Sequence, residues 1–368
     1  MMQINSPLPI FKGRRELCRI TEMFFPSFRS LTFFSLLPLF ANLVDATPVL
    51  KRESRTSAPS GAVVVRASGA ASGEYSTVQA AVDSLADDGT DQVIFIYEGT
   101  YTEQVYIDRD GQTTIMGQTS DTSSYASNTV TITYSLSLAS ADDDDSTGTL
   151  RVHKDDFALY NVNVKNTFGK ASTDGQALAL SAYGTNHGYY GVGFYSYQDT
   201  VLAQTGNQFY GSCYIEGAVD YIFGQYARAY FHQSTLASVG AGAITANGRP
   251  SSDGVSLYVI NESTITTSSS ATTSLEGLVY LGRPWAAYAR VVYTSCSLGD
   301  LINSAGWEEW SSSEPNTDGV TFAEYGSSGD GASGTRASFA TTLTSTSGYT
   351  ISDVLGSDYP DWVDSDYL

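Results

Sequence analysis

The chain has 368 residues, of which 19 are Lys or Arg and 39 are Asp or Glu, so its formal net charge at pH 7 is -20. A surface this acidic excludes general binding to nucleic acid or to anionic membranes, because both carry the same sign of charge. Only 16% of the residues are charged, whereas Gly (34) and Tyr (25) are abundant. This composition disfavours a helical bundle and favours strands covered by hydroxyl and aromatic groups.

The N-terminal region has the pattern of a secretory signal peptide. Arg29 precedes an apolar run at residues 31–44, and the small residues Ala46 and Thr47 follow it, which is the order of a basic, an apolar and a cleavage region. We therefore expect a secreted, extracellular protein. The expected division is a signal peptide over residues 1–46 (with Met23 as an alternative start), a pro-segment or linker over 47–60, and one domain over 61–368.

A first strand is predicted over Ala62 to Arg66, and one helix follows it. Ser76 and Gln79 have the spacing of a capping box, and apolar residues at positions 78, 81, 82 and 85 recur with the period of a helix. No comparable helical pattern follows. We expect this short helix to cap one end of the domain.

The rest of the chain consists of short strand-like runs. Three of them, which start at Phe157, Tyr189 and Gln208, have similar sequences, and a repeat of about 20 to 30 residues with three strands is typical of a parallel β-helix. The alternative is a β-sandwich. It is less favoured because a sandwich of this length needs two domains, and no internal linker separates two cores.

Several smaller features carry weaker expectations. The run Asp142–Asp145 is predicted to be a solvated turn rather than a calcium site. Cys213 and Cys296 could form one disulfide, but their spacing does not decide it. The three histidines are scattered, so no metal site is expected. Asn261 begins a glycosylation sequon (Asn-Glu-Ser).

The candidate chemistry lies in polar residues that recur at one spacing. Gln176 and Gln198 are 22 residues apart, and Asp199 and Asp220 are 21 residues apart. Each offset matches one coil of a β-helix, in which neighbouring strands lie about 4.8 Å apart. Two carboxyl groups held so close have pKa values that separate, so one serves as base or nucleophile and the other as general acid. The alternative is that these residues have a purely structural role, as a ladder of stacked polar side chains.

Two further residue types would complete such a site. Arg283 can fork onto the carboxylate of Asp220 and keep it charged, although the offset of 63 residues is about three coils and does not establish that they meet. The amide groups of Gln176 and Gln198 can stabilise an oxyanion. No G-x-S-x-G sequence is present, which argues against a serine esterase.

Nine segments of the sequence form a recognisable set of motifs. They are the opening strand and helix at residues 63–83, Gly99–Glu103 (GTYTE), Gln176–Leu180 (QALAL), Gln198–Leu202 (QDTVL), Val219–Gly224 (VDYIFG), Ile244–Arg249 (ITANGR), Leu281–Trp285 (LGRPW), Gly306–Trp310 (GWEEW) and Phe322–Tyr325 (FAEY). Through these segments the sequence resembles the secreted fungal pectin methylesterases (pectinesterases) over nearly the whole predicted mature chain. Its departures from their motifs are small: Val201 is inserted in the Q-D-T-L string, Tyr221 replaces a Phe and Asn247 replaces a Gln.

The resemblance implies an all-β, single-domain, right-handed parallel β-helix that hydrolyses methyl esters of galacturonate in pectin without a cofactor. It makes Asp220 the nucleophile, Asp199 the general acid/base and Arg283 the residue that holds the nucleophile. The expected remaining site residues are the oxyanion donors Gln176 and Gln198 and the substrate contacts Trp285, Phe223, Val219 and Arg249. We also expect a monomer that binds methyl-esterified pectin. The rival interpretations are a β-helix glycoside hydrolase and a non-catalytic wall-binding protein.

Overall fold

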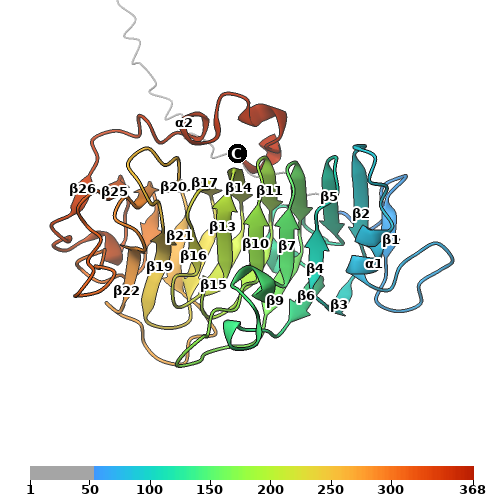
Figure 1. Cartoon of the computed structure of the whole chain (residues 1–368), viewed down its shortest axis with the longest axis horizontal. Helices are drawn as coiled ribbons and strands as arrows, with labels where there is room; N and C mark the ends of the chain where they lie inside the picture. The colour runs from blue at the N-terminus through green and yellow to red at the C-terminus, as the bar shows by residue number, and fades with distance from the viewer. Residues whose placement is uncertain (1–53) are drawn as a thin grey trace, which may run out of the picture. The chain divides into compact units, whose positions relative to one another are not determined.

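The computed structural model describes residues 54–368, and the predicted signal peptide and residues 47–53 lie outside the described residues. The strands of this part pair in parallel and form three sheets of eleven, seven and eight strands (Figure 1). This arrangement confirms the prediction of an all-β chain folded as a parallel β-helix.

Three consecutive strands make one coil, and from β7 to β24 every third strand returns to the same sheet. The eleven-stranded sheet contains Val63–Val65 (β1), Gln92–Ile96 (β2), Thr113–Gly117 (β5), Phe157–Tyr160 (β8), His187–Tyr190 (β11), Asn207–Gly211 (β14), Arg228–His232 (β17), Leu257–Asn261 (β20), Arg290–Thr294 (β23), Thr321–Tyr325 (β25) and Ala340–Thr342 (β26). The seven-stranded sheet contains Val105–Ile107 (β4), Leu150–His153 (β7), Leu180–Tyr183 (β10), Val201–Thr205 (β13), Ile222–Gly224 (β16), Gly242–Asn247 (β19) and Val279–Pro284 (β22). The eight-stranded sheet contains Gly99–Thr102 (β3), Val130–Tyr134 (β6), Asn163–Asn166 (β9), Gly193–Tyr195 (β12), Tyr214–Gly217 (β15), Thr235–Ser238 (β18), Thr264–Thr267 (β21) and Ser297–Leu298 (β24).

The core fills the inside of the coils, where side chains at equivalent positions stack on one another. Tyr189, Tyr210 and Phe231 lie on β11, β14 and β17, and their ring centroids are 4.7 and 4.4 Å apart. The three similar segments found in the sequence include β8, β11 and β14, which are neighbouring strands of the eleven-stranded sheet. Their uneven spacing arises because the loop at residues 167–179 lengthens the first of these coils.

The predicted helix is present as α1, Val78–Asp83, and it packs against β1, β2 and β4 at the N-terminal end of the sheets. The prediction of its capping residue was wrong. The N-cap is Thr77, whose side chain accepts a hydrogen bond from the Ala80 N–H (3.3 Å), rather than Ser76.

The capping box predicted for α1 is replaced by a carboxylate from elsewhere in the chain. Glu103, which follows β3, accepts hydrogen bonds from the backbone N–H groups of Val78 (2.8 Å) and Gln79 (2.9 Å). The Gln79 side chain instead binds Asp83 and the backbone of Tyr106. An anion at a helix N-terminus satisfies otherwise unpaired donors, so Glu103 fixes the helix to the sheets.

The C-terminal segment, residues 343–368, covers the outer face of the eleven-stranded sheet (Figure 1). It contains the second helix, Ile351–Leu355 (α2), which contacts β14 and β17. The buried residues of this segment are Val354, Leu355, Val363 and Tyr367, and they pack with outward-facing Tyr190, Phe209, Tyr230 and Val259.

The two cysteines of the described part are free and buried, so the disulfide left open by the sequence does not form. Their positions explain why. Cys213 and Cys296 occupy equivalent sites three coils apart, with Ser234 and Ser263 between them, which corresponds to about 14 Å at the spacing of β-strands. A disulfide requires Cα atoms within about 7 Å.

Candidate active site

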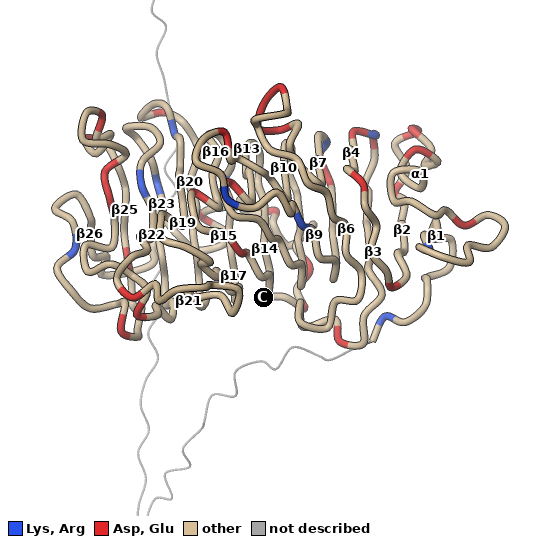
Figure 2. The backbone as a smooth tube through the Cα atoms, turned by 90° about the horizontal axis from the view of Figure 1, so that it is seen from below, with Lys and Arg blue, Asp and Glu red and all other residues tan. Residues whose placement is uncertain are grey.

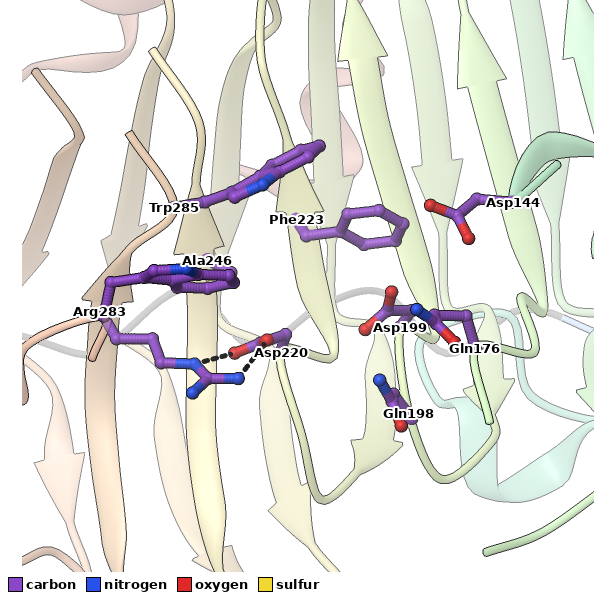
Figure 3. A pocket seen from close by; sticks show the side chains of 10 residues that line it. Asp144, Gln176, Gln198, Asp199, Asp220, Phe223, Ala246, Arg283 and Trp285 are labelled. Atoms are coloured by element: carbon purple, nitrogen blue, oxygen red, sulfur yellow. Dashed lines mark hydrogen bonds and ion pairs between the residues drawn. The ribbon is translucent and has the colours of Figure 1, made fainter. Parts of the chain in front are cut away.

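A pocket of about 260 Å³ opens on the outer face of the seven-stranded sheet, and it contains three carboxyl groups, two amides and one guanidinium (Figure 3). Its floor includes a row of paired residues on successive strands, Phe223, Ala246 and Arg283. The lining residues are Asp144, Gln176, Gln198, Asp199, Asp220, Phe223, Ala246, Arg283, Trp285 and Trp310.

Asp199 and Asp220 lie in equivalent turns of neighbouring coils, each two residues before the first residue of its strand, β13 or β16. Gln198 bridges Val219 in parallel, and Val201 pairs with Ile222, so the two aspartates are one coil apart. Both have positive φ (62° and 49°), a left-handed conformation that Asp tolerates better than most residues. The predicted stack of two aspartates on one face is therefore present.

Arg283 meets Asp220 in the forked geometry that the sequence could not establish. Its Nε and Nη2 donate hydrogen bonds to Oδ1 (2.9 Å) and Oδ2 (2.7 Å) of Asp220. The two residues lie only two coils apart, not three, because β16 pairs with β19 and β19 pairs with β22. The loops at residues 248–256 and 268–278 lengthen the second of these coils.

The surroundings of the two aspartates separate their protonation behaviour. Burial, followed by the charges of Asp220 and Asp144, raises the pKa of Asp199 well above its usual value. Burial also raises the pKa of Asp220, but the hydrogen bonds and charge of Arg283 oppose that rise. Because Arg283 binds only Asp220 directly, Asp199 is the group that holds a proton more readily and Asp220 the one that is stabilised as a carboxylate.

Gln176 and Gln198 both line this pocket beside Asp199 (Figure 3). The backbone N–H of Ala177 donates to the carbonyl of Gln198 (3.2 Å), which ties the two segments together. The buried Oε1 of Gln176 has no hydrogen-bond partner within residues 54–368. A buried amide oxygen without a hydrogen bond costs free energy. Because Gln176 lines the pocket, a hydrogen-bond donor of a bound ligand can satisfy this oxygen.

Aromatic side chains form the other wall. Phe223 is buried, Trp285 is half-buried, and their ring centroids are 6.2 Å apart. Gly248 lies against the indole of Trp285, and a Cβ at this position would come within 2.6 Å of the ring. Trp310 lies over Arg283, with the guanidinium carbon 4.4 Å from the ring centroid, a cation–π contact that helps to fix the fork.

Two residues predicted to contact substrate are not brought to this pocket. Val219 is half-buried next to Asp220 but does not line the pocket. Arg249 is buried, and its guanidinium donates to the backbone carbonyls of residues 252, 254 and 288. Arg249 therefore holds a loop in place, and its predicted contact with substrate has no support from this geometry.

Three lining residues were missed by the sequence analysis, namely Asp144, Ala246 and Trp310. Ala246 and Trp310 belong to the motifs at residues 244–249 and 306–310, but nothing in the sequence assigned either residue to the site. Asp144 lies in the acidic run that we expected to be a solvated turn. That expectation holds for exposed Asp142 and Asp143 only. Asp145 accepts hydrogen bonds from Arg151, His153 (2.8 Å) and Ser181 (2.6 Å).

The predicted glycosylation site lies on β20. The Nδ2 of Asn261 is within hydrogen-bond distance of the His232 ring (2.9 Å), and its Oδ1 accepts from Thr294 (2.8 Å). Ser263 of the sequon is buried. The side chain of Asn261 is thus hydrogen-bonded to its neighbours, and its glycosylation stays a prediction.

Within the described residues, no group of three or more His, Cys, Asp and Glu could hold a metal ion.

Within residues 54–368, no helix has both the length and the apolar character needed to cross a bilayer.

Comparison with known proteins places this geometry in a family. The pectinesterase family model matches residues 62–353. The chain is 51% identical over 320 residues to a pectinesterase of Aspergillus niger, covering 86% of this chain and 94% of that protein. It is 52% identical over 321 residues to a pectinesterase of Aspergillus aculeatus, covering 86% and 95%.

Solved structures agree. The crystal structure of the pectin methylesterase from Aspergillus niger superposes with a TM-score of 0.79 at 40% identity, over 86% of this chain and all of that one. The pectin methylesterase from carrot superposes with a TM-score of 0.74 at 27% identity, over 86% and 98%. The chain therefore belongs to the pectinesterase family of carboxylic ester hydrolases.

Proposed function

We propose that this protein hydrolyses the methyl esters of galacturonate units in pectin, with Asp220 as nucleophile and Asp199 as general acid and base. The observation that carries the proposal is the carboxyl pair of neighbouring coils, of which only Asp220 is forked by Arg283 (2.9 and 2.7 Å). A carboxylate held charged next to a carboxyl that retains its proton is the arrangement that such chemistry needs.

The first half of the reaction forms an acyl-enzyme. An Oδ of Asp220 attacks the ester carbonyl carbon, and the developing oxyanion accepts hydrogen bonds from the amides of Gln176 and Gln198. The bond to the methoxy oxygen breaks while Asp199 transfers its proton to that oxygen, so neutral methanol leaves. The product is an anhydride between Asp220 and the galacturonate unit, and Asp199 is now a carboxylate.

The second half reverses the proton transfer. Asp199 takes a proton from a water molecule, whose oxygen attacks the galacturonyl carbon of the anhydride. The bond to Asp220 breaks, which restores the Asp220 carboxylate and the Asp199 proton and yields a free galacturonate. Aromatic side chains such as Trp285 and Phe223 provide faces for the C–H surface of a sugar beside the reacting ester.

The test is methanol release from methylated pectin by the wild type and by Asp220→Asn. We expect the wild type to release methanol without producing new reducing ends, and the folded variant to lose activity by about 10⁴-fold or more, as for other nucleophile deletions. New reducing ends would indicate glycoside hydrolysis instead. Binding of pectin without methanol release would indicate a wall-binding protein, and near-normal activity of Asp220→Asn would refute the assigned roles.

We further propose that the protein acts as a secreted monomer on pectin outside the cell. The sequence pattern of residues 1–46 and the wall-directed activity of the family support secretion. N-terminal sequencing of the protein from culture medium tests the cleavage after Ala46, and light scattering of the purified protein tests the monomer.

A further inference from the structure

Asp144 is a carboxyl group of the pocket for which the proposed reaction has no use. It immediately precedes the short 3₁₀ turn Asp145–Thr147 (η3) between β6 and β7. In Figure 3 its side chain lies beyond Phe223 and Asp199, on the side of the pocket away from Arg283. Its Oδ1 is buried and has no hydrogen-bond partner in the described part of the chain.

The turn that carries Asp144 is held firmly. The neighbouring Asp145 binds Arg151 and His153 of β7 and Ser181 of β10. Thr147 donates its hydroxyl to the backbone carbonyl of Asp144 (2.7 Å). The unpaired carboxyl is therefore positioned by contacts of the residues that follow it in the turn, and it faces the pocket as a fixed group.

Acidic groups surround Asp144, and within residues 54–368 no cation pairs with it. Burial, followed by the charge of Asp143 in the same turn, raises the pKa of Asp144. Across the pocket Asp144 faces Asp199, whose pKa it helps to raise, and the phenol of Tyr183 on β10.

The cations near Asp144 already have carboxylate partners. Arg151 and His153 pair with Asp145, and Arg283 pairs with Asp220.

This distribution of charge distinguishes the two forms of a galacturonate unit. A methyl ester is neutral and meets no penalty beside Asp144. A free carboxylate is negative and would approach Asp144 in a partly desolvated pocket whose one guanidinium is already paired, so it is repelled. The carboxylate that the reaction itself produces experiences the same repulsion.

We propose, on the basis of the proposed function, that Asp144 is a specificity-determining residue that makes the pocket accept neutral methyl esters and reject free carboxylates, including the newly formed product. The discrimination depends on an ionised Asp144. It is therefore strongest at neutral pH and weakens as the medium becomes acidic enough to protonate this group.

The experiment compares the wild type with Asp144→Asn, which removes the charge, and Asp144→Glu, which keeps it. Asp142→Asn is the matched control, because Asp142 is exposed in the same acidic run and does not line the pocket. For each protein we would measure kcat/KM on highly and weakly esterified pectin, and inhibition by unesterified oligogalacturonate at pH 7.

We expect Asp144→Asn to lower the ratio of the two kcat/KM values by about fivefold and to tighten inhibition by a similar factor, as for loss of one partly screened unit charge. The alkaline limb of its kcat/KM profile should also move to lower pH, because Asp199 loses a neighbouring negative charge. Asp144→Glu and Asp142→Asn should keep the wild-type discrimination.

An unchanged ratio and unchanged inhibition in folded Asp144→Asn would overturn the proposal. Asp144→Ser removes the same charge and carries the same expectation if the Asn variant does not fold. Failure of the proposed function has a different signature, because the wild type would then release no methanol from pectin of any degree of esterification.

Discussion

Asp199 and Asp220 are equally hidden from solvent, with 7% and 6% of their surface exposed, so depth of burial does not distinguish them. What distinguishes them is the partner on each side. Asp220 has a guanidinium fork, whereas Asp199 has two further carboxyl groups, Asp220 and Asp144. The roles of acid and nucleophile thus follow from the neighbours of two identical side chains.

Arg283→Lys tests the fork. A lysine retains the charge but cannot make two parallel hydrogen bonds, so we expect kcat to fall by about 100-fold, the cost of losing charge-assisted bonds of about 3 kcal/mol. Because Arg283 lowers the pKa of Asp220, the acid limb of kcat/KM should move to higher pH. The measurement is methanol release across the pH range.

Arg66→Lys is the matched control, since Arg66 makes a similar fork to Glu74 (2.9 and 3.1 Å) outside the pocket. It should retain the wild-type rate and pH profile. Wild-type kinetics in Arg283→Lys would show that Arg283 is a structural residue only.

Asp199→Asn should stabilise the fold at neutral pH. Burial raises the pKa of Asp199 in the folded state, so the wild type loses stability as the pH rises above about 4, where the unfolded chain gives up the same proton. Asparagine has no proton to lose. We therefore expect the melting temperature of the variant to exceed that of the wild type at pH 7 and to match it near pH 3.

Asp220→Asn provides the contrast, because it leaves the partly buried Arg283 without its carboxylate and should lower the melting temperature at pH 7. A melting temperature of Asp199→Asn at or below the wild type at both pH values would contradict the assigned protonation state.

At this scale the sequence predicted most of the pocket. Regular offsets of 21 and 22 residues were enough to group Asp199, Asp220 and the two glutamines, because successive coils repeat the same turn. Arg283 could be named as a partner but not placed, since the loops at 248–256 and 268–278 break the period. Asp144 lies in a loop before β7, where no periodic pattern signals its direction.

At the scale of elements, α1 shows how a tertiary contact replaces a local one. The helix was predicted from its apolar period, and the prediction of its cap failed because Glu103 of a neighbouring segment binds the first N–H groups. A capping box is local and can be read from four adjacent residues. A carboxylate 24 or 25 residues away can be recognised only once the strands are placed.

Glu103→Gln should destabilise this end of the protein. The amide retains an acceptor but loses the charge that favours the helix N-terminus, so we expect a loss of about 1 kcal/mol in the free energy of unfolding. Denaturant titration measures it, and exposed Glu98→Gln is the control. Equal stability of the two variants would show that the charge of Glu103 contributes nothing.

At the scale of the whole described chain, stability comes from stacked apolar coils and not from a covalent crosslink. Burial raises the pKa of both thiols, Cys213 and Cys296, to about 12. We expect neither to react with a thiol reagent in the native protein at pH 8 and both to react after unfolding in guanidinium. A reducing agent should leave the melting temperature unchanged, and a decrease would contradict the free thiols.

Charge is also a property of the whole. In Figure 2 acidic residues recur along the entire set of coils, and basic residues are fewer. Composition therefore predicted correctly that the surface charge is mainly negative. It could not predict that Arg283 is the one cation among the described residues that line the pocket, or that Arg283 is paired with Asp220. That required the contacts of individual side chains.

The parallel pairing of β13 with β16 has a consequence for how such a protein can diverge. The separation of the two aspartate turns is set by one step of the hydrogen-bonded ladder, about 4.8 Å, and not by any loop. The loops between the strands, such as residues 135–149 with Asp144 and residues 299–320 with Trp310, determine what surrounds the reacting ester, and a change in their length leaves that step constant. The residues that line the pocket can therefore change during evolution without altering the distance between the two aspartates. That distance is fixed by the hydrogen-bonded spacing of neighbouring strands.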